Sequence, residues 1–306
     1  MEDGGELVGI AFVKAVEATL HCRLDGTNVL ALLQNRVGSA ARACYRRLAW
    51  GVTKGEATVT ISADQKDFDS SAVLGLREDL ALALRAAALH GLAEGVCNHF
   101  SVELPDGSGR FLLNPRGLLW SEVQADDIVL VDGRGRTLAG RHPVEATAMF
   151  IHGAIHRLGR KACVLHTHMP YATALTLTAD RALDTTLSQN AMRFHDRVAV
   201  DANYNGLALD ASEGERIATA MGGADVAFLG NHGIVVCGER MAHAYDDLYY
   251  LERACMAQVL AQSTGRPLVP VDASIAERVR DQTLGDRLQS ELFFEALRRG
   301  TNLREK

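Results

Sequence analysis

The chain has 306 residues, 47% of them hydrophobic and 23% charged, a composition typical of a globular protein with a sizeable core. Its 32 basic and 38 acidic residues give a net charge of −6 without any lysine or arginine block, so nucleic acid is not an expected partner. No apolar run approaches the length of a membrane span, so we expect no membrane partner either. The six cysteines include no CxxC pair and the acidic N-terminus is unlike a signal peptide, which favours reduced cysteines and a cytoplasmic location.

The first half of the chain contains one segment without recognisable chemistry and then a regular pattern. We interpret residues 1–70 as an N-terminal extension that precedes a domain of residues 71–306. Alanine and leucine at helical spacing predict a helix over 72–94. Residues 98–140 alternate short apolar runs with glycine-containing turns, which predicts an antiparallel meander. A proline then opens a predicted helix over 144–158.

The second half alternates apolar strands with longer helices. A strand over 162–165 leads into His166-Thr167-His168, and two further strands, over 226–229 and 234–237, flank a glycine turn. We expect helices over 186–194, 212–222, 239–262 and 274–299, and Ser-x-x-Glu capping boxes open the second and the fourth. This order predicts the α/β class, with a mixed or antiparallel sheet covered by helices.

Three histidines are candidates for one metal site. His166 and His168 alternate at the end of a strand, where alternate side chains share a face, so their imidazoles point the same way. His232 lies between two strands in a Gly-Asn-His-Gly turn, whose glycines allow close backbone approach. Three neutral imidazoles with an open coordination position are typical of catalytic zinc (Zn2+), and Mn2+ or Fe2+ also suit them. Spacing alone does not place His232 beside His166 and His168. The alternative is therefore that these two histidines only hydrogen-bond to backbone carbonyls and bind no metal.

Five motifs, in the same order, resemble the class II aldolase/adducin family. Residues 98–101 resemble the family's first loop, and residues 111–118 its anion-binding turn. Residues 151–156 resemble its central helix, 166–173 its metal-binding strand, and 231–233 the turn that carries the third metal ligand. The resemblance covers well over half of the chain and leaves the first 70 residues outside it.

The resemblance implies a three-layer α/β domain with a central, largely antiparallel sheet between helices, and in many members a homo-tetramer. It also implies a divalent metal, most often zinc, that stabilises an enolate of a small anionic substrate during carbon–carbon cleavage. By position, His166, His168 and His232 are the metal ligands. The first loop and the anion-binding turn supply the expected substrate-binding residues: Asn98, Ser101, Asn114, Arg116 and Gly117.

Two departures from the sugar-phosphate aldolases resemble the adducin-like branch of the family. Ala148 replaces the acid/base glutamate, and the nearest acid, Glu145, is either its substitute or a solvated residue of the first helical turn. Arg116 replaces a small hydroxyl residue, and it either pairs with a carboxylate or phosphate or is a surface turn residue. Tyr171 either donates to the substrate or packs against its neighbours.

The sequence therefore supports two hypotheses from different classes. The first is a metal-dependent lyase that cleaves or decarboxylates a small anionic hydroxy or oxo substrate through a metal-stabilised enolate, with Glu145 and Tyr171 as catalytic residues. The second, suggested by Ala148, is a non-catalytic adducin-like interaction module. For either hypothesis the resemblance implies a homo-oligomer.

Overall fold

Eight short strands form one sheet in the computed structural model, which describes residues 62–304. The strands are β1 His99–Glu103, β2 Phe111–Leu113, β3 Val129–Val131, β4 Thr137–Ala139, β5 Cys163–Thr167, β6 Val198–Asp201, β7 Val226–Leu229 and β8 Gly233–Gly238. Their order across the sheet is β4-β3-β2-β1-β5-β8-β7-β6. Of the pairs described, β6 and β7 are parallel and the others are antiparallel.

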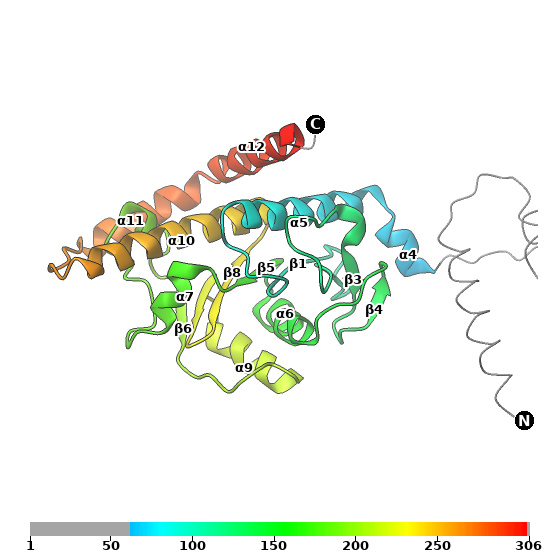
Figure 1. Cartoon of the computed structure of the whole chain (residues 1–306), viewed down its shortest axis with the longest axis horizontal. Coiled ribbons are helices and arrows are strands. Elements are labelled where there is room, and N and C mark those ends of the chain that lie inside the picture. Colours follow the sequence, from blue (N-terminus) through cyan, green and yellow to red (C-terminus); the bar gives the residue numbers. More distant parts are fainter. Residues whose placement is uncertain (1–61, 305–306) are drawn as a thin grey trace, which may run out of the picture. The chain divides into compact units, whose positions relative to one another are not determined.

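Helices cover both faces of this sheet (Figure 1). On one face lie α5 Ser71–Leu89 and α10 Met241–Ser263, and on the other lie α6 Ala146–Gly159 and α9 Ala211–Met221. The remaining helices are α4 Ala63–Phe68, η1 Ala125–Asp127, α7 Pro170–Thr176, α8 Gln189–Met192, α11 Ala273–Gly285 and α12 Leu288–Arg304. The predicted α/β class, with a largely antiparallel sheet between helical layers, is confirmed.

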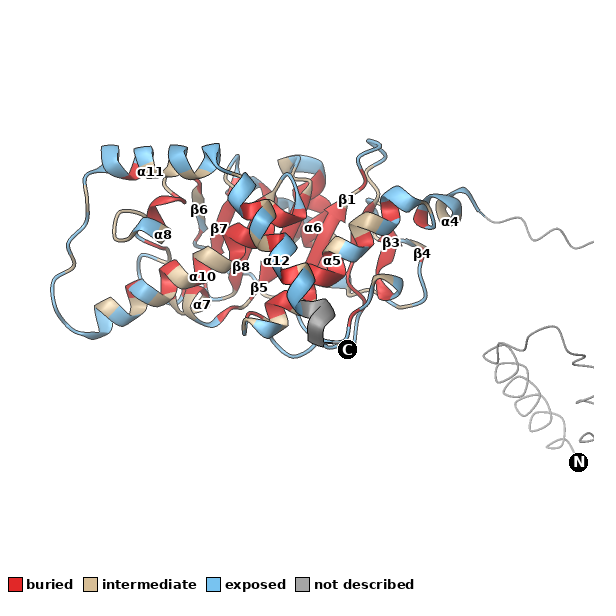
Figure 2. Cartoon of the chain, turned by 90° about the horizontal axis from the view of Figure 1, so that it is seen from above, coloured by how far each residue is buried: buried red, intermediate tan, exposed pale blue. Residues whose placement is uncertain are grey.

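Alternation along the strands divides the buried side chains between the two layers. In β1, Phe100 and Val102 join the core under α5 and α10, so His99 and Ser101 face the α6 side. In β5, Leu165 joins the first core, whereas Val164 packs with α6 and α9. Apart from the edge strands β4 and β6, the strands are almost entirely buried (Figure 2), which explains why their sequences read as short apolar runs.

The α6 side of the sheet is closed by an unusually tight helix contact. A Cβ atom at Gly214 of α9 would lie 2.2 Å from the backbone oxygen of Phe150 in α6, so only glycine fits there. This approach brings α9 over α6 and fixes the face of α6 that carries His152 and His156 against the sheet.

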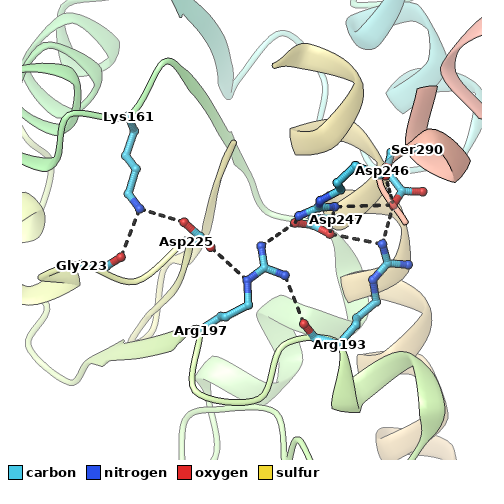
Figure 3. Close-up of polar contacts among 9 residues, drawn as sticks. Lys161, Arg193, Arg197, Gly223, Asp225, Asp246, Asp247 and Ser290 are labelled. Carbon is cyan, nitrogen blue, oxygen red and sulfur yellow. Dashed lines mark hydrogen bonds and ion pairs between the residues drawn. The ribbon is translucent and has the colours of Figure 1, made fainter. Parts of the chain in front are cut away.

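A buried network of ion pairs ties the helices of the other side together (Figure 3). Asp247 of α10 accepts from Arg197 at 2.7 Å and from Arg287 at 2.9 Å, while its neighbour Asp246 accepts from Arg193. Burial raises the pKa of the Asp247 carboxyl, but hydrogen bonding and the arginine charges outweigh it and lower the pKa below its usual value. The helix predicted over 274–299 is wrong as one element: α11 ends at Gly285, the backbone of Asp286 leaves the helical conformation with φ of −116° and ψ of 56°, and Arg287, just before α12, reaches this network.

Other element predictions need smaller corrections. The helix predicted over 186–194 is confined to α8, and β4 was not predicted as a separate strand within the meander. Helix α9 begins before Ser212, because Asp210 is the N-cap and accepts from the backbone N–H groups of residues 212 and 213. Asp210 and Ser212 are both residue types that cap helices, and the Asp210 carboxylate is the one within hydrogen-bond distance of the free N–H groups.

Most of the predicted N-terminal extension, residues 1–70, lies outside the described residues, and its boundary stays a prediction. The described part contains α4, whose Phe68 is buried in the main core. Asp64 and Asp67 of α4 pair with Arg110 at 2.8 and 2.9 Å. No helix within residues 62–304 is both long enough and apolar enough to cross a membrane.

Candidate metal centre

Three histidines converge at one end of the central strands. His166 lies in β5, His168 follows that strand, and His232 immediately precedes β8. Strands β5 and β8 pair antiparallel with Thr167 opposite Ile234, so the end of one strand meets the start of the other. The ring centroids are 5.2 Å apart for His166 and His168, 4.8 Å for His166 and His232, and 5.0 Å for His168 and His232. One ligand nitrogen from each ring lies within 4.8 Å of the others, so the sheet brings the three predicted ligands together.

The outer nitrogens of two of these rings are held by the protein. Nδ1 of His166 donates to the backbone oxygen of Ile234 at 2.9 Å, and Nδ1 of His168 lies 2.5 Å from a carboxylate oxygen of Glu94. Both contacts direct Nε2 inward, and Nε2 of His168 is buried without a partner among the described residues. A carbonyl or carboxylate behind each ligand histidine is the usual arrangement around a protein-bound metal. The residues present therefore fit a divalent metal ion.

The local electrostatics favour the neutral imidazoles that bind metals. Burial, together with the neighbouring His232 and His168, lowers the pKa of His166 well below its usual value. Burial and the His168 ring lower the pKa of His232 to about 4. At neutral pH these rings keep a free lone pair, which is the form a metal requires.

The turn that carries His232 depends on its glycines. A Cβ atom at Gly233 would lie 2.5 Å from Cδ2 of His168 and 2.9 Å from the backbone oxygen of Thr167. Asn231 adopts a left-handed conformation with φ of 57°, and its side-chain oxygen accepts from Arg181 at 2.7 Å. The turn thus brings its backbone against His168 and presents His232 to the other two rings.

Two residues predicted to bind substrate, Asn98 and Asn114, hold the first loop in place. Asn98 has φ of 72°, and its side-chain oxygen accepts from the backbone N–H of His168 at 3.2 Å. The side-chain oxygen of Asn114 accepts from the backbone N–H of Phe100 at 2.9 Å. Both asparagines are buried, so the structure gives them positioning contacts, and a role in binding substrate stays a prediction.

The predicted anion-binding turn lies beside the predicted acid/base residue. Nε of Arg116 is 3.0 Å from a carboxylate oxygen of Glu145, the N-cap of α6, and the Arg116 side chain is 64% exposed. Gly117 follows with φ of 88°. Ala148 is buried with Phe111 and its apolar neighbours, so no carboxylate is present at that position.

The remaining predicted catalytic residue, Tyr171, begins the segment after the metal strand. Its side chain packs partly buried against the main core. Its backbone N–H donates to Glu252 at 2.8 Å, and that of Ala172 donates to the same carboxylate at 2.9 Å. Glu252 of α10 therefore satisfies the start of α7, directly after the ligand His168.

Four residues around the site were not among the site residues predicted from the sequence; two of them, His152 and His156, are expected from the sequence to face the core or an interface. Glu94 lies in a loop whose pattern carries no signal for a partner 74 positions away. His99 stands directly opposite His166 in the β1–β5 register. His152 and His156 are spaced by four on α6, which places them on one helix face, and both hydrogen-bond to the predicted substrate residue Ser101, at 2.6 and 2.7 Å. The shared face was the available signal, but only the fold brings Ser101 to it.

Comparison with known proteins places the chain in a recognisable group. The family model described as Class II Aldolase and Adducin N-terminal domain matches residues 78–259. A Pseudomonas aeruginosa protein, named as a provisional class 2 aldolase, is 33% identical over 74% of this chain and 86% of its own. The decarboxylase NovR of Streptomyces niveus is 31% identical over 68% and 77% of the two chains. An adducin-related protein of Schizosaccharomyces pombe is 30% identical over 61% and 59%.

A solved structure shows the same arrangement of elements. The crystal structure of an aldolase II superfamily protein from Pseudomonas syringae superposes with a TM-score of 0.71 at 34% identity. It covers 77% of this chain and 95% of that one.

Proposed function

The chain belongs to the class II aldolase and adducin family, and on this premise we propose that it is a metal-dependent lyase. Its proposed substrate is a small anionic hydroxy or oxo compound that it cleaves between two carbons or decarboxylates. The observation that carries the proposal is the convergence of His166, His168 and His232 within reach of one ion. A divalent ion bound there, most often zinc in such sites, supplies Lewis-acid stabilisation of negative charge on oxygen.

The ion pair between the exposed Arg116 and the partly buried Glu145 supports an anionic substrate. An exposed ion pair contributes only about 0–1 kcal/mol, so a substrate carboxylate or phosphate can displace Glu145 at little cost. The guanidinium then offers the incoming anion two parallel hydrogen bonds. Glu145, released from Arg116, and the Tyr171 hydroxyl remain proposed proton-transfer groups.

Carbon–carbon cleavage and decarboxylation share one chemical requirement, so we propose that the protein catalyses one or the other. Each leaves an electron pair on carbon that must be delocalised onto an adjacent oxygen. One relative carries the name decarboxylase, which supports the second reaction alongside the first. The family resemblance also leads us to propose a homo-oligomer, a tetramer, in the cytoplasm, and light scattering after size-exclusion chromatography tests the assembly.

Metal analysis of protein purified without an affinity tag tests the metal. We expect one divalent ion per chain in the wild type and its loss in His232→Ala. Turnover is then screened with sugar phosphates, 2-oxo acids and aromatic carboxylic acids in the presence of zinc, manganese or iron(II). Turnover that disappears in His166→Ala supports the lyase. Wild-type protein with little or no divalent metal, and a His232→Ala variant with the same metal content, would contradict it.

A second candidate function, a non-catalytic adducin-like interaction module, is favoured by one observation. Ala148 lies in an apolar cluster with Phe111, Leu113, Val129 and Val131, so the acid/base carboxylate of the aldolases is missing. A module of this kind would show no turnover in the screen with any of the three metals. Turnover abolished by His166→Ala rules the module out as the sole function.

A further inference from the structure

Three buried side chains form a hydrogen-bonded chain on the α6 face of the sheet. Nδ1 of His152 lies 2.6 Å from the Ser101 hydroxyl, and Nε2 of His156 lies 2.7 Å from the same hydroxyl. Nδ1 of His156 lies 2.6 Å from the backbone oxygen of Lys161. The three side chains are all buried, so water does not substitute for these contacts.

The carbonyl at the end of this chain sets the position of every proton in it. A carbonyl only accepts, so Nδ1 of His156 carries a proton. Burial lowers the pKa of His156 to about 4 and that of His152 well below its usual value, so each ring has a single N–H. Nε2 of His156 is then an acceptor for the Ser101 hydroxyl. Ser101 in turn accepts from Nδ1–H of His152, which leaves Nε2 of His152 as a bare lone pair.

That lone pair is buried without a partner among the described residues. Buried acceptors without a donor are rare in native structures, so this one requires a reason. The rings of His152 and His99 stand edge to face with centroids 6.1 Å apart, and His99 is opposite His166 in the sheet. His152 is therefore the member of this hydrogen-bonded set that lies beside His99, the neighbour of the metal ligand His166 in the sheet.

We propose that His152 is the group that accepts the proton of the substrate hydroxyl in this site, in addition to the proposed proton-transfer groups Glu145 and Tyr171, and that Ser101 and His156 are positioning residues that keep its Nε2 free of a proton. The inference rests on the proposed lyase function. It supplies the proton acceptor that Ala148, one helical turn earlier on α6, does not. Catalytic hydrogen bonds of this kind often form only when substrate is bound.

The step is a retro-aldol cleavage in which every proton has a destination. The substrate hydroxyl loses its proton to Nε2 of His152, and the O–H electron pair becomes the new carbonyl bond. The carbon–carbon bond breaks, and its electron pair moves onto the oxygen of the neighbouring carbonyl, which leaves an enolate that takes a proton from water at carbon to become the product. The Nδ1 proton of His152 passes to Ser101, and the Ser101 proton passes to Nε2 of His156. The positive charge thus ends on His156, where the Lys161 carbonyl stabilises it.

The proton positions are tested without any substrate. In zinc-loaded protein labelled with 15N-histidine, long-range 1H–15N correlation spectra distinguish the two neutral tautomers of each ring. We expect the Nδ1–H tautomer for both His152 and His156, with the signals assigned by their absence in His152→Gln and His156→Gln. In Ser101→Ala, His152 should become a mixture of tautomers at unchanged zinc content. An Nε2–H tautomer of His152 in the wild type overturns the inference.

An activity assay is the second test, and it measures the release of pyruvate from 4-hydroxy-2-oxopentanoate. We expect His152→Gln to lower the rate by about 10²–10⁴-fold at full zinc occupancy, the usual range for loss of a general base. Added imidazole should restore part of the rate of His152→Ala. His142→Gln, at a half-buried histidine paired with Asp127, is the matched control and should keep wild-type activity. A wild-type rate in His152→Gln refutes the role of His152 alone, whereas an inactive wild type with the expected tautomers refutes the lyase function for this substrate class.

Discussion

Glu94 should influence the metal affinity of the site through its contact with the proposed ligand His168. Its carboxylate lies 2.5 Å from Nδ1 of His168. That contact orients the ring and makes Nε2 a more basic metal ligand. Removing such a partner typically costs 10–100-fold in affinity, which corresponds to about 1.4–2.7 kcal/mol. The Glu94 side chain is 58% exposed, so water replaces part of the lost contact and we expect Glu94→Ala near the lower end, about tenfold.

The backbone of His168 should remain in place in this variant, because Asn98 still accepts from its N–H. Glu94→Gln keeps an oxygen that accepts from Nδ1–H but lacks the charge, so its loss should be smaller than that of Glu94→Ala. Competition titrations against a chromophoric chelator measure the zinc Kd of each variant. Glu215→Ala, which removes an exposed carboxylate paired with Arg157 at 2.5 Å, is the matched control.

A Glu94→Ala protein that binds zinc as tightly as the wild type would refute this role of Glu94. The role would equally be refuted if Glu215→Ala lost as much affinity as Glu94→Ala, since a general change in surface charge would then explain both.

Three further predictions concern other parts of the molecule. Gly233→Ala should abolish stoichiometric zinc binding while the circular dichroism spectrum stays helical, because the new Cβ lies 2.5 Å from His168 Cδ2; normal zinc content would contradict this. Asp247→Asn should destabilise the protein by about 3–5 kcal/mol in urea unfolding at pH 7, since it removes the buried negative charge that Arg193, Arg197 and Arg287 share. The folded-state pKa of Asp247 is lowered, so its contribution is complete above the unfolded value of about 3.9 and is lost as the pH falls through the folded value; a gap between wild type and variant that widens in acid would refute this. Arg116→Ala should raise KM for an anionic substrate at unchanged zinc content, and an unchanged KM would remove Arg116 from the binding site.

Much of the metal site could be predicted from local sequence. The alternation of His166 and His168 at a strand end places two imidazoles on one face whatever the rest of the fold does. The glycine turn around His232 signals a backbone that must approach something closely, and the structure identifies that neighbour as His168. What the spacing did not reveal was that the two segments meet, because that depends on the pairing of β5 with β8 across the sheet.

The acid/base chemistry depended far more on tertiary structure. Ser101 resembled a substrate-binding residue in a family motif, yet strand alternation and the packing of α6 place it between two histidines. Glu145 was the nearest acid in the sequence, but the fold pairs it with Arg116. Side-chain partners of this kind come from segments about 30 to 75 residues apart, and no local pattern encodes which of them will meet.

By itself, the sequence determined the element types, the two-histidine strand and the glycine turn, because helix period, strand period and backbone freedom are local properties. The tertiary structure alone decided which side chains share the site and in what protonation state. Register between distant strands brings His232 to His166 and His168, and the proposed tautomers of His156 and His152 depend on one backbone carbonyl, that of Lys161. These partners are set by hydrogen bonds between segments that are distant in the sequence, and such hydrogen bonds form only when the chain has folded.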